Sequence, residues 1–201
     1  MALVVVVAIL RHTHRDAAPS NSVAPAMPEA TWASGAKHAP DFLLTDQDGR
    51  AVSIARFRGR PVILTFIDPL CRNLCPLEAK VIESVETTLP TSERPAVIAV
   101  SVDRWGDARR YLVQDDIKWK LGSRWHWAVG KPAALRRVWR SYEIAVLDLK
   151  KTVAGVTVHN ISHTEGVFLL DRRGYERALY LFPFTASDVA RTVRRLAGAQ
   201  A

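Results

Sequence analysis

Residues 66–80 read FIDPLCRNLCPLEAK, and the fold can be worked out from this stretch. It holds both cysteines of the 201-residue chain, Cys71 and Cys75, with Pro76 directly after the second. The run RPVILTFI at 60–67 is almost wholly apolar, which is typical of a strand buried on both faces. The stretch therefore predicts a buried strand, a loop carrying two thiols, and an element that begins at the proline.

An amphipathic helix is predicted directly after the cysteines. Proline is favoured in the first helical turn, so Pro76 places Cys75 at or beside the N-cap and Cys71 in the preceding loop. Apolar residues then recur at intervals of four, at Leu77, Val81, Val85 and Leu89. The unpaired N–H groups and the dipole of such a helix start favour thiolate over thiol.

The rest of the pattern predicts an α/β fold. AVIAVSVD at 96–103 is a second doubly buried strand, which makes a parallel βαβ unit with the first. Asp48-Gly49 is a good hairpin turn within 41–54. Further helices are expected over 107–116, 132–142 and about 185–198, and further strands over 124–129 and in a hairpin over 166–182. The order predicts a thioredoxin-like fold with an N-terminal β-hairpin and a central mixed sheet flanked by helices.

Composition fits one globular domain and argues against nucleic acid as a partner. Hydrophobic residues make up 48% of the chain, and the net charge is +8. The basic residues are scattered in pairs, and no basic stripe interleaved with aromatic residues is present, as a nucleic-acid groove requires. The excess positive charge favours an acidic partner or a membrane surface.

The N-terminus predicts a tethered domain. Residues 2–10 are apolar, a run that suits the core of a signal sequence or a truncated anchor, because a spanning helix needs about 20 such residues. A buried N-terminal strand is the competing interpretation. Residues 16–39 are rich in Ala, Pro and Ser and predict a flexible tether. We expect a signal or anchor at 1–15, a tether at 16–39 and the folded domain at 40–201.

Three kinds of chemistry are open to the two cysteines. A structural disulfide is the weakest, because closing so small a loop removes little chain entropy. Cys71 and Cys75 could instead form a redox-active dithiol/disulfide, or they could hold a soft metal as two thiolates. The choice between redox and metal chemistry depends on whether a third ligand is within reach.

A histidine would be the natural third ligand, since sulfur together with imidazole suits copper. The chain has six histidines, His12, His14, His38, His126, His159 and His163. His163 stands just before the predicted strand GVFLLD, and in a thioredoxin-like topology the loop entering this strand faces the cysteine loop. We therefore expect His163 to reach both sulfurs. His159 is the reserve candidate, and its plainer interpretation is an exposed strand residue.

Three segments resemble the Sco/SenC family of thioredoxin-like copper proteins. They are FLLTDQDGRAVSIARFRGRPVILTFIDPLCRNLCP, SVDRWGD and HTEGVFLLDRRG, in the expected order from about residue 40 onward. The resemblance implies that Cys71, Cys75 and His163 bind copper, as Cu(I) or Cu(II), and that Asp103 has a supporting role. It implies a copper metallochaperone that assists assembly of the copper centre of cytochrome c oxidase, or reduces that centre's cysteines. It also implies an N-terminally tethered protein on the periplasmic side of the bacterial inner membrane.

The partner implied is the copper-bearing subunit of cytochrome c oxidase or another periplasmic copper or thiol protein. The chain departs from the family pattern at Arg104 and Ala108, where Pro and Thr are usual, and at Asp68-Pro69. These departures affect the docking surface and leave the implied ligands in place. The alternative function is a membrane-tethered thiol–disulfide oxidoreductase, for which the cysteines alone would suffice. Against it, no proline follows His163 at the entry to the next strand.

Overall fold

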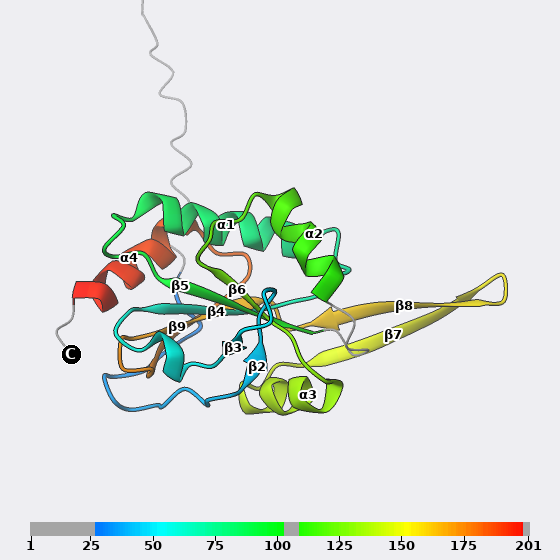
Figure 1. Cartoon of the computed structure of the whole chain (residues 1–201), viewed down its shortest axis with the longest axis horizontal. Coiled ribbons are helices and arrows are strands. Elements are labelled where there is room, and N and C mark those ends of the chain that lie inside the picture. Colours follow the sequence, from blue (N-terminus) through cyan, green and yellow to red (C-terminus); the bar gives the residue numbers. More distant parts are fainter. Residues whose placement is uncertain (1–26, 103–108, 199–201) are drawn as a thin grey trace, which may run out of the picture.

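A six-stranded mixed sheet lies at the centre of the molecule (Figure 1). The computed structural model describes residues 27–102 and 109–198. The sheet has the order β1-β10-β9-β4-β5-β6, in which β4, β5 and β6 are parallel and the others add antiparallel. Its strands are β1 (Ala30–Thr31), β4 (Val62–Ile67), β5 (Ala96–Ser101), β6 (Trp125–Ala128), β9 (Gly166–Leu170) and β10 (Glu176–Leu181). The α/β, thioredoxin-like fold expected from the sequence is confirmed.

Helices cover both faces of this sheet and create two apolar cores. Along β4 every residue is buried, with Ile63 and Ile67 in one core and Leu64 and Phe66 in the other. The first core includes residues of α1 (Leu74–Thr88), α2 (Arg109–Trp119) and α4 (Ala186–Gly198), and the second includes residues of α3 (Pro132–Ser141). Burial on both faces explains why β4 and β5 are apolar runs instead of alternating patterns.

Helix α1 begins two residues earlier than the sequence predicts. Asn73 is its N-cap, with a side-chain oxygen that accepts from the Leu74 N–H, so Cys75 lies inside the first turn. The predicted apolar face is partly wrong, since Leu77 is 50% exposed. The row that packs on the sheet starts at Cys75 and continues through Ala79, Ile82, Val85 and Leu89. Turning Cys75 inward turns Leu77 outward, because the two lie on different faces of the helix.

In the part of the chain that the structure describes, two hairpins stand outside the central sheet. The predicted N-terminal hairpin is present as β2 (Leu44–Thr45) and β3 (Ala51–Val52). The sequence analysis assigned no element to the second, formed by β7 (Val146–Val153) and β8 (Val156–His163). It projects from the body of the molecule (Figure 1). Ala154 and Gly155 form its turn with positive φ angles of 49° and 79°. The hairpin ends at His163, which therefore lies just before the start of β9 in the central sheet.

The first strand lies within the segment expected to be a tether. Ala30 pairs with Leu179 of β10, and Ala39 is completely buried. The C-terminal part of 16–39 therefore lies against the sheet. The segment 1–15 and Asp103 fall outside the described residues. Within the described ranges, the structure contains no helix long and apolar enough to cross a membrane.

Candidate metal and thiol site

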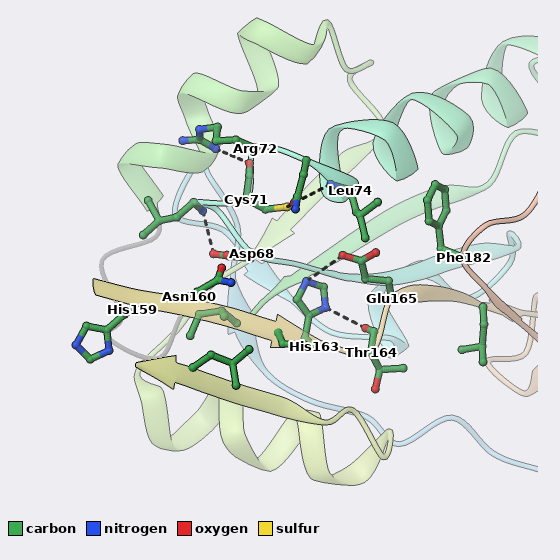
Figure 2. Close-up of a pocket in the computed structure, with 16 residues that line it drawn as sticks. Asp68, Cys71, Arg72, Leu74, His159, Asn160, His163, Thr164, Glu165 and Phe182 are labelled. Atoms are coloured by element: carbon green, nitrogen blue, oxygen red, sulfur yellow. Dashed lines mark hydrogen bonds and ion pairs between the residues drawn. The ribbon is translucent and has the colours of Figure 1, made fainter. Parts of the chain in front are cut away.

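The cysteine loop is held in a tight turn by Asp68. One carboxylate oxygen of Asp68 accepts the Leu70 N–H at 2.9 Å, and its carbonyl oxygen accepts the Cys71 N–H at 3.1 Å (Figure 2). Because β4 ends at Ile67, this turn places Cys71 directly beyond the carboxyl end of a central parallel strand. That is where open α/β sheets place their functional sites.

The two thiols are free and lie close to each other. Cys71 is half-buried, and Cys75 is 1% exposed. The backbone N–H of Cys75 donates to Sγ of Cys71 at 3.3 Å, and the Cys71 thiol lies 2.9 Å from Oδ1 of Asn73. Cys71 is thus the accessible sulfur, and Cys75 is the sulfur behind it.

The surroundings shift the pKa values of the two thiols in opposite directions. A hydrogen bond from the Cys75 thiol, opposed by burial and helped by backbone groups, lowers the pKa of Cys71 to about 6. Donating that hydrogen bond, together with burial, raises the pKa of Cys75 far above its ordinary value. The helix start at α1 adds a dipole that favours negative charge on both sulfurs. Near neutral pH the pair therefore carries one negative charge, centred on Cys71.

His163 reaches Cys75 from the end of β8, whereas the sequence predicted that it would reach both sulfurs. Its Nε2 atom lies 3.7 Å from Sγ of Cys75, and its side chain is 3% exposed. Nδ1 lies 3.0 Å from the carbonyl oxygen of Thr164 and must donate there, because a carbonyl can only accept (Figure 2). The neutral ring therefore carries its proton on Nδ1 and turns the Nε2 lone pair toward Cys75.

The other described histidines do not contact the two sulfurs. His159 lines the same cavity, but its Nδ1 pairs with Asp148 at 2.9 Å and its ring points away from the sulfurs (Figure 2). His38 packs against Tyr175, and His126 packs against Phe57. His12 and His14 fall outside the described residues. Of the histidines that the structure describes, His163 is the one it brings to the cysteine pair.

Glu165 belongs to the site, although the sequence analysis gave it no role. Ligand atoms of Cys71, Cys75 and Glu165 all lie within 4.8 Å of one another. Oε1 of Glu165 is also 3.9 Å from Nε2 of His163, and burial raises the pKa of this carboxyl above its ordinary value. Its position two residues after His163 in the same loop was the available signal.

Arg72 fastens the loop to α2. Its guanidinium donates to the carbonyl oxygens of Pro69 at 3.1 Å and of Cys71 at 2.7 Å. The same nitrogen lies 3.6 Å from Oδ1 of Asp115, a carboxylate that is 2% exposed. This contact spans 43 positions of the chain (115 minus 72), so no local sequence pattern could reveal it.

A buried acid lies behind Cys75. Glu78 is fully buried, and Oγ1 of Thr65 donates to its Oε1 at 2.5 Å. Oγ1 of Thr65 is also 3.2 Å from the carbonyl oxygen of Gly166, so the contact joins α1, β4 and β9. Burial raises the pKa of Glu78 to about 8. Glu78 is therefore largely protonated at neutral pH.

Cys71 opens into a cavity of about 770 Å³, and Cys75 lies buried behind it. One wall is the cysteine loop, another is β8 with His163, and Leu181 and Phe182 close a third side. Cys71, His163 and Glu165 line it, and the sulfur of Cys75 lies just behind this wall, in contact with His163. This donor set suits a soft metal ion, and the dithiol equally suits thiol–disulfide exchange.

Comparisons with known proteins agree with this fold. The SCO1/SenC family model matches residues 31–198. The copper-bound structure of Bradyrhizobium japonicum ScoI is 22% identical with a TM-score of 0.68, covering 79% of this chain and 99% of its own. BsSco, described with a disulfide switch as a member of the Sco family of cytochrome c oxidase assembly proteins, is 18% identical with a TM-score of 0.66, covering 87% of this chain and 100% of its own.

Two further likenesses differ in extent. A SCO1/SenC family lipoprotein from Bacillus anthracis is 20% identical with a TM-score of 0.64, covering 87% of this chain and 99% of its own. The peroxiredoxin Q proteins of two Oryza sativa subspecies are 64% identical over 28 residues, which is 14% of this chain and 13% of theirs. The chain thus spans a small part of the peroxiredoxins, and the match assigns no peroxidase activity.

Proposed function

The chain belongs to the SCO1/SenC family, and from that we propose that it is a copper metallochaperone for the copper centre of cytochrome c oxidase. The observation that carries the proposal is the grouping of Cys71, Cys75 and His163 at the edge of one open cavity, with Cys71 and His163 in its lining and Cys75 in contact with both. Copper is the cargo of this protein. Support comes from ScoI, which has been solved with copper bound in the same fold.

The three side chains have distinct tasks in holding the cargo. Cys71 binds first as the thiolate, because it is the accessible and more acidic sulfur. Cys75 binds next by releasing its thiol proton, and Nε2 of His163 completes a trigonal set without losing a proton. Two thiolates suit Cu(I), and the added imidazole lets the set accept Cu(II). Few ligands in an open cavity favour transfer, since an incoming thiolate can displace one ligand at a time.

The partner proposed is the copper-bearing subunit of cytochrome c oxidase or another periplasmic copper or thiol protein. The description of BsSco as a cytochrome c oxidase assembly protein supports this choice. We place the protein on the periplasmic side of the inner membrane, held by its N-terminus. The apolar residues 2–10 and the lipoprotein from Bacillus anthracis support a tether.

Thiol–disulfide exchange is the second candidate function, and the lowered pKa of Cys71 favours it. The Cys71 thiolate would attack a partner disulfide, forming a mixed disulfide and releasing one partner thiolate. Cys75 would then lose its proton and attack Sγ of Cys71, releasing the second partner thiolate. The partner gains two electrons, and Cys71 and Cys75 end as a disulfide. The disulfide switch described for BsSco supports this chemistry.

Copper titration of the reduced full-length chain tests the first proposal. We expect one equivalent to bind, with sulfur-to-Cu(II) charge-transfer absorption that is lost in Cys71→Ala and in Cys75→Ala. Thr164→Ser is a matched control, because it changes the same loop and leaves the backbone acceptor of His163 in place. Absence of stoichiometric binding by the wild type would overturn the copper proposal and leave the exchange reaction as the function.

A further inference from the structure

We propose that one face of the β7–β8 hairpin docks an extended, apolar segment of the thiol-bearing protein that receives the copper. This inference rests on the proposed function, because it names the surface by which the receiving protein reaches Cys71. The hairpin has no part in holding the cargo except through His163 at its end. Its length and composition therefore need another explanation.

The register of the hairpin sorts its side chains into two unlike faces. Directly paired residues share a face, so 147, 149, 151 and 153 lie on the same side as 162, 160, 158 and 156. That face carries every large apolar side chain of the hairpin that is more than half exposed, namely Leu147, Leu149, Val153, Val156 and Val158. The opposite face carries Asp148, Lys150, Thr152, Thr157 and His159, and it carries Val146, Ile161 and His163 at the end away from the turn. The hairpin is therefore amphipathic, with its apolar side open to solvent.

The apolar face is continuous with the metal and thiol site. Leu149, Asn160 and Ser162 of this face line the cavity that contains Cys71. His159, Ile161 and His163 of the opposite face line it as well, so this end of the hairpin borders the cavity with both faces. Across the cavity, Leu70 of the cysteine loop and Leu74 at the start of α1 are 47% and 43% exposed. A segment lying on the hairpin face would therefore enter the cavity between two apolar walls and arrive at the accessible sulfur.

The hairpin is built to accept an extended segment. Among the described residues, β7 and β8 pair with each other and with no third strand, so each keeps an outer edge with open backbone groups. An isolated two-stranded hairpin is only marginally stable in water, and a third strand with an apolar face stabilises it. An added strand would bond to an edge through its backbone and lay alternate side chains on the apolar face.

Charge and size restrict the occupant further. Lys151 is the one charged residue on the apolar face, so a neutral or acidic segment fits and a basic one is repelled. A cavity of about 770 Å³ admits a few residues of an extended chain and excludes a folded domain. A segment that offers thiols or other soft ligands completes the match, because Cys71 can pass copper only to such groups.

A pair of variants that differ by one position tests the docking face. Val158→Asp places a charge on the apolar face, and Thr157→Asp places the same charge on the opposite face at the next residue. Both positions are exposed and lie about 16 Å or more along the strand from His163, so neither touches the ligands. The full-length proteins are loaded with Cu(I). They are then mixed either with the metal-free, copper-bearing domain of cytochrome c oxidase from the same organism or with a small Cu(I) chelator.

We expect Val158→Asp to slow transfer to the oxidase domain about tenfold or more, since a charge in a desolvated contact is costly. Thr157→Asp should stay within about twofold of wild type, and both variants should bind one copper and feed the chelator at the wild-type rate. Equal transfer to the oxidase domain by the two variants would overturn the docking face, while copper binding would still stand. A wild-type dimer that Val158→Asp dissociates would also overturn it, because the occupant would be a second copy. Failure of the wild type to bind copper would instead overturn the proposed function.

Discussion

Nε2 of His163 lies 3.7 Å from Sγ of Cys75, although 88 positions separate the two residues. The register of the sheet produces this meeting. Thr65 near the end of β4 pairs with Val167 near the start of β9, so the chain just before β9 must pass the loop that follows β4. The hydrogen bond from Nδ1 to Thr164 then fixes which nitrogen faces the sulfur.

Loss of the His163 imidazole should weaken Cu(II) binding more than Cu(I) binding. We expect His163→Ala to weaken Cu(II) binding by about 10- to 100-fold, as loss of an oriented ligand does. Cu(I) binding should fall much less, because two thiolates remain. Competition titrations with chelators for each oxidation state would measure both affinities. His159→Ala is the matched control on the same strand, and an equal loss of Cu(II) affinity in that variant would contradict the assignment.

Much of the fold could be predicted because its signals are local. A short window of sequence is enough to recognise the continuous apolar runs of β4 and β5. The same holds for the proline that follows Cys75. The position of His163 required one further step, from the order of elements to the edge where loops meet. The apolar face predicted for helix α1 was partly wrong, because spacing alone cannot say whether Cys75 or Leu77 turns inward.

The rest depended on contacts between distant segments. Asp115 reaches Arg72 across 43 positions, and Oε1 of Glu78 accepts a hydrogen bond from Thr65 on a neighbouring strand. The β7–β8 hairpin carries an alternating pattern, yet charged and apolar residues on a free-standing pair of strands resemble a loop. Such features are set by the packed chain and have no signature in a short stretch of sequence.

The acidity of Cys71 depends on the thiol of Cys75, which is the largest cause of its lowered pKa. In the wild type, the rate of alkylation at Cys71 should rise with pH around a midpoint of about 6. Cys75→Ser retains a hydrogen-bond donor and should keep the midpoint low, whereas Cys75→Ala should move it upward. Mass spectrometry of the reduced, copper-free protein across a pH series would give the midpoints. Equal midpoints in the Ser and Ala variants would show that the backbone N–H groups set this acidity.

The Arg72–Asp115 ion pair should act as a positioning contact for the cysteine loop. Arg72→Ala removes hydrogen bonds to two loop carbonyls and leaves a buried carboxylate without its cation, so we expect a loss of stability of about 1–3 kcal/mol. Amide exchange in residues 68–73 should become faster, and copper affinity should fall severalfold.

A second ion pair in the same chain provides the control for Arg72→Ala. Arg191 and Asp188 lie 2.8 Å apart, with side chains 57% and 3% exposed against 50% and 3% for Arg72 and Asp115. Arg191→Ala should therefore lower stability by a similar route and leave amide exchange in the loop and copper affinity unchanged. If both variants weakened copper binding equally, the effect would belong to global stability and Arg72 would have no positioning role.

Glu78 should make the copper-free protein less stable as the pH rises. Its pKa in the folded state is about 8, above the ordinary 4.5 of the unfolded chain, because burial disfavours the charged form. Between about pH 5 and pH 8 the unfolded state has released this proton while the folded state still holds it. The free energy of unfolding therefore loses about 1.4 kcal/mol per pH unit from this group.

Glu78→Gln keeps the shape of the side chain and cannot ionise, so the stability of this variant relative to wild type should rise from pH 5 to pH 8. Urea unfolding of both proteins at each pH gives this difference, from which the opposite contribution of Cys71 cancels. Glu86→Gln should give a smaller rise, because burial takes the pKa of Glu86 only to about 7. A difference that stayed flat from pH 5 to pH 8 would mean that Glu78 is ionised in the folded protein.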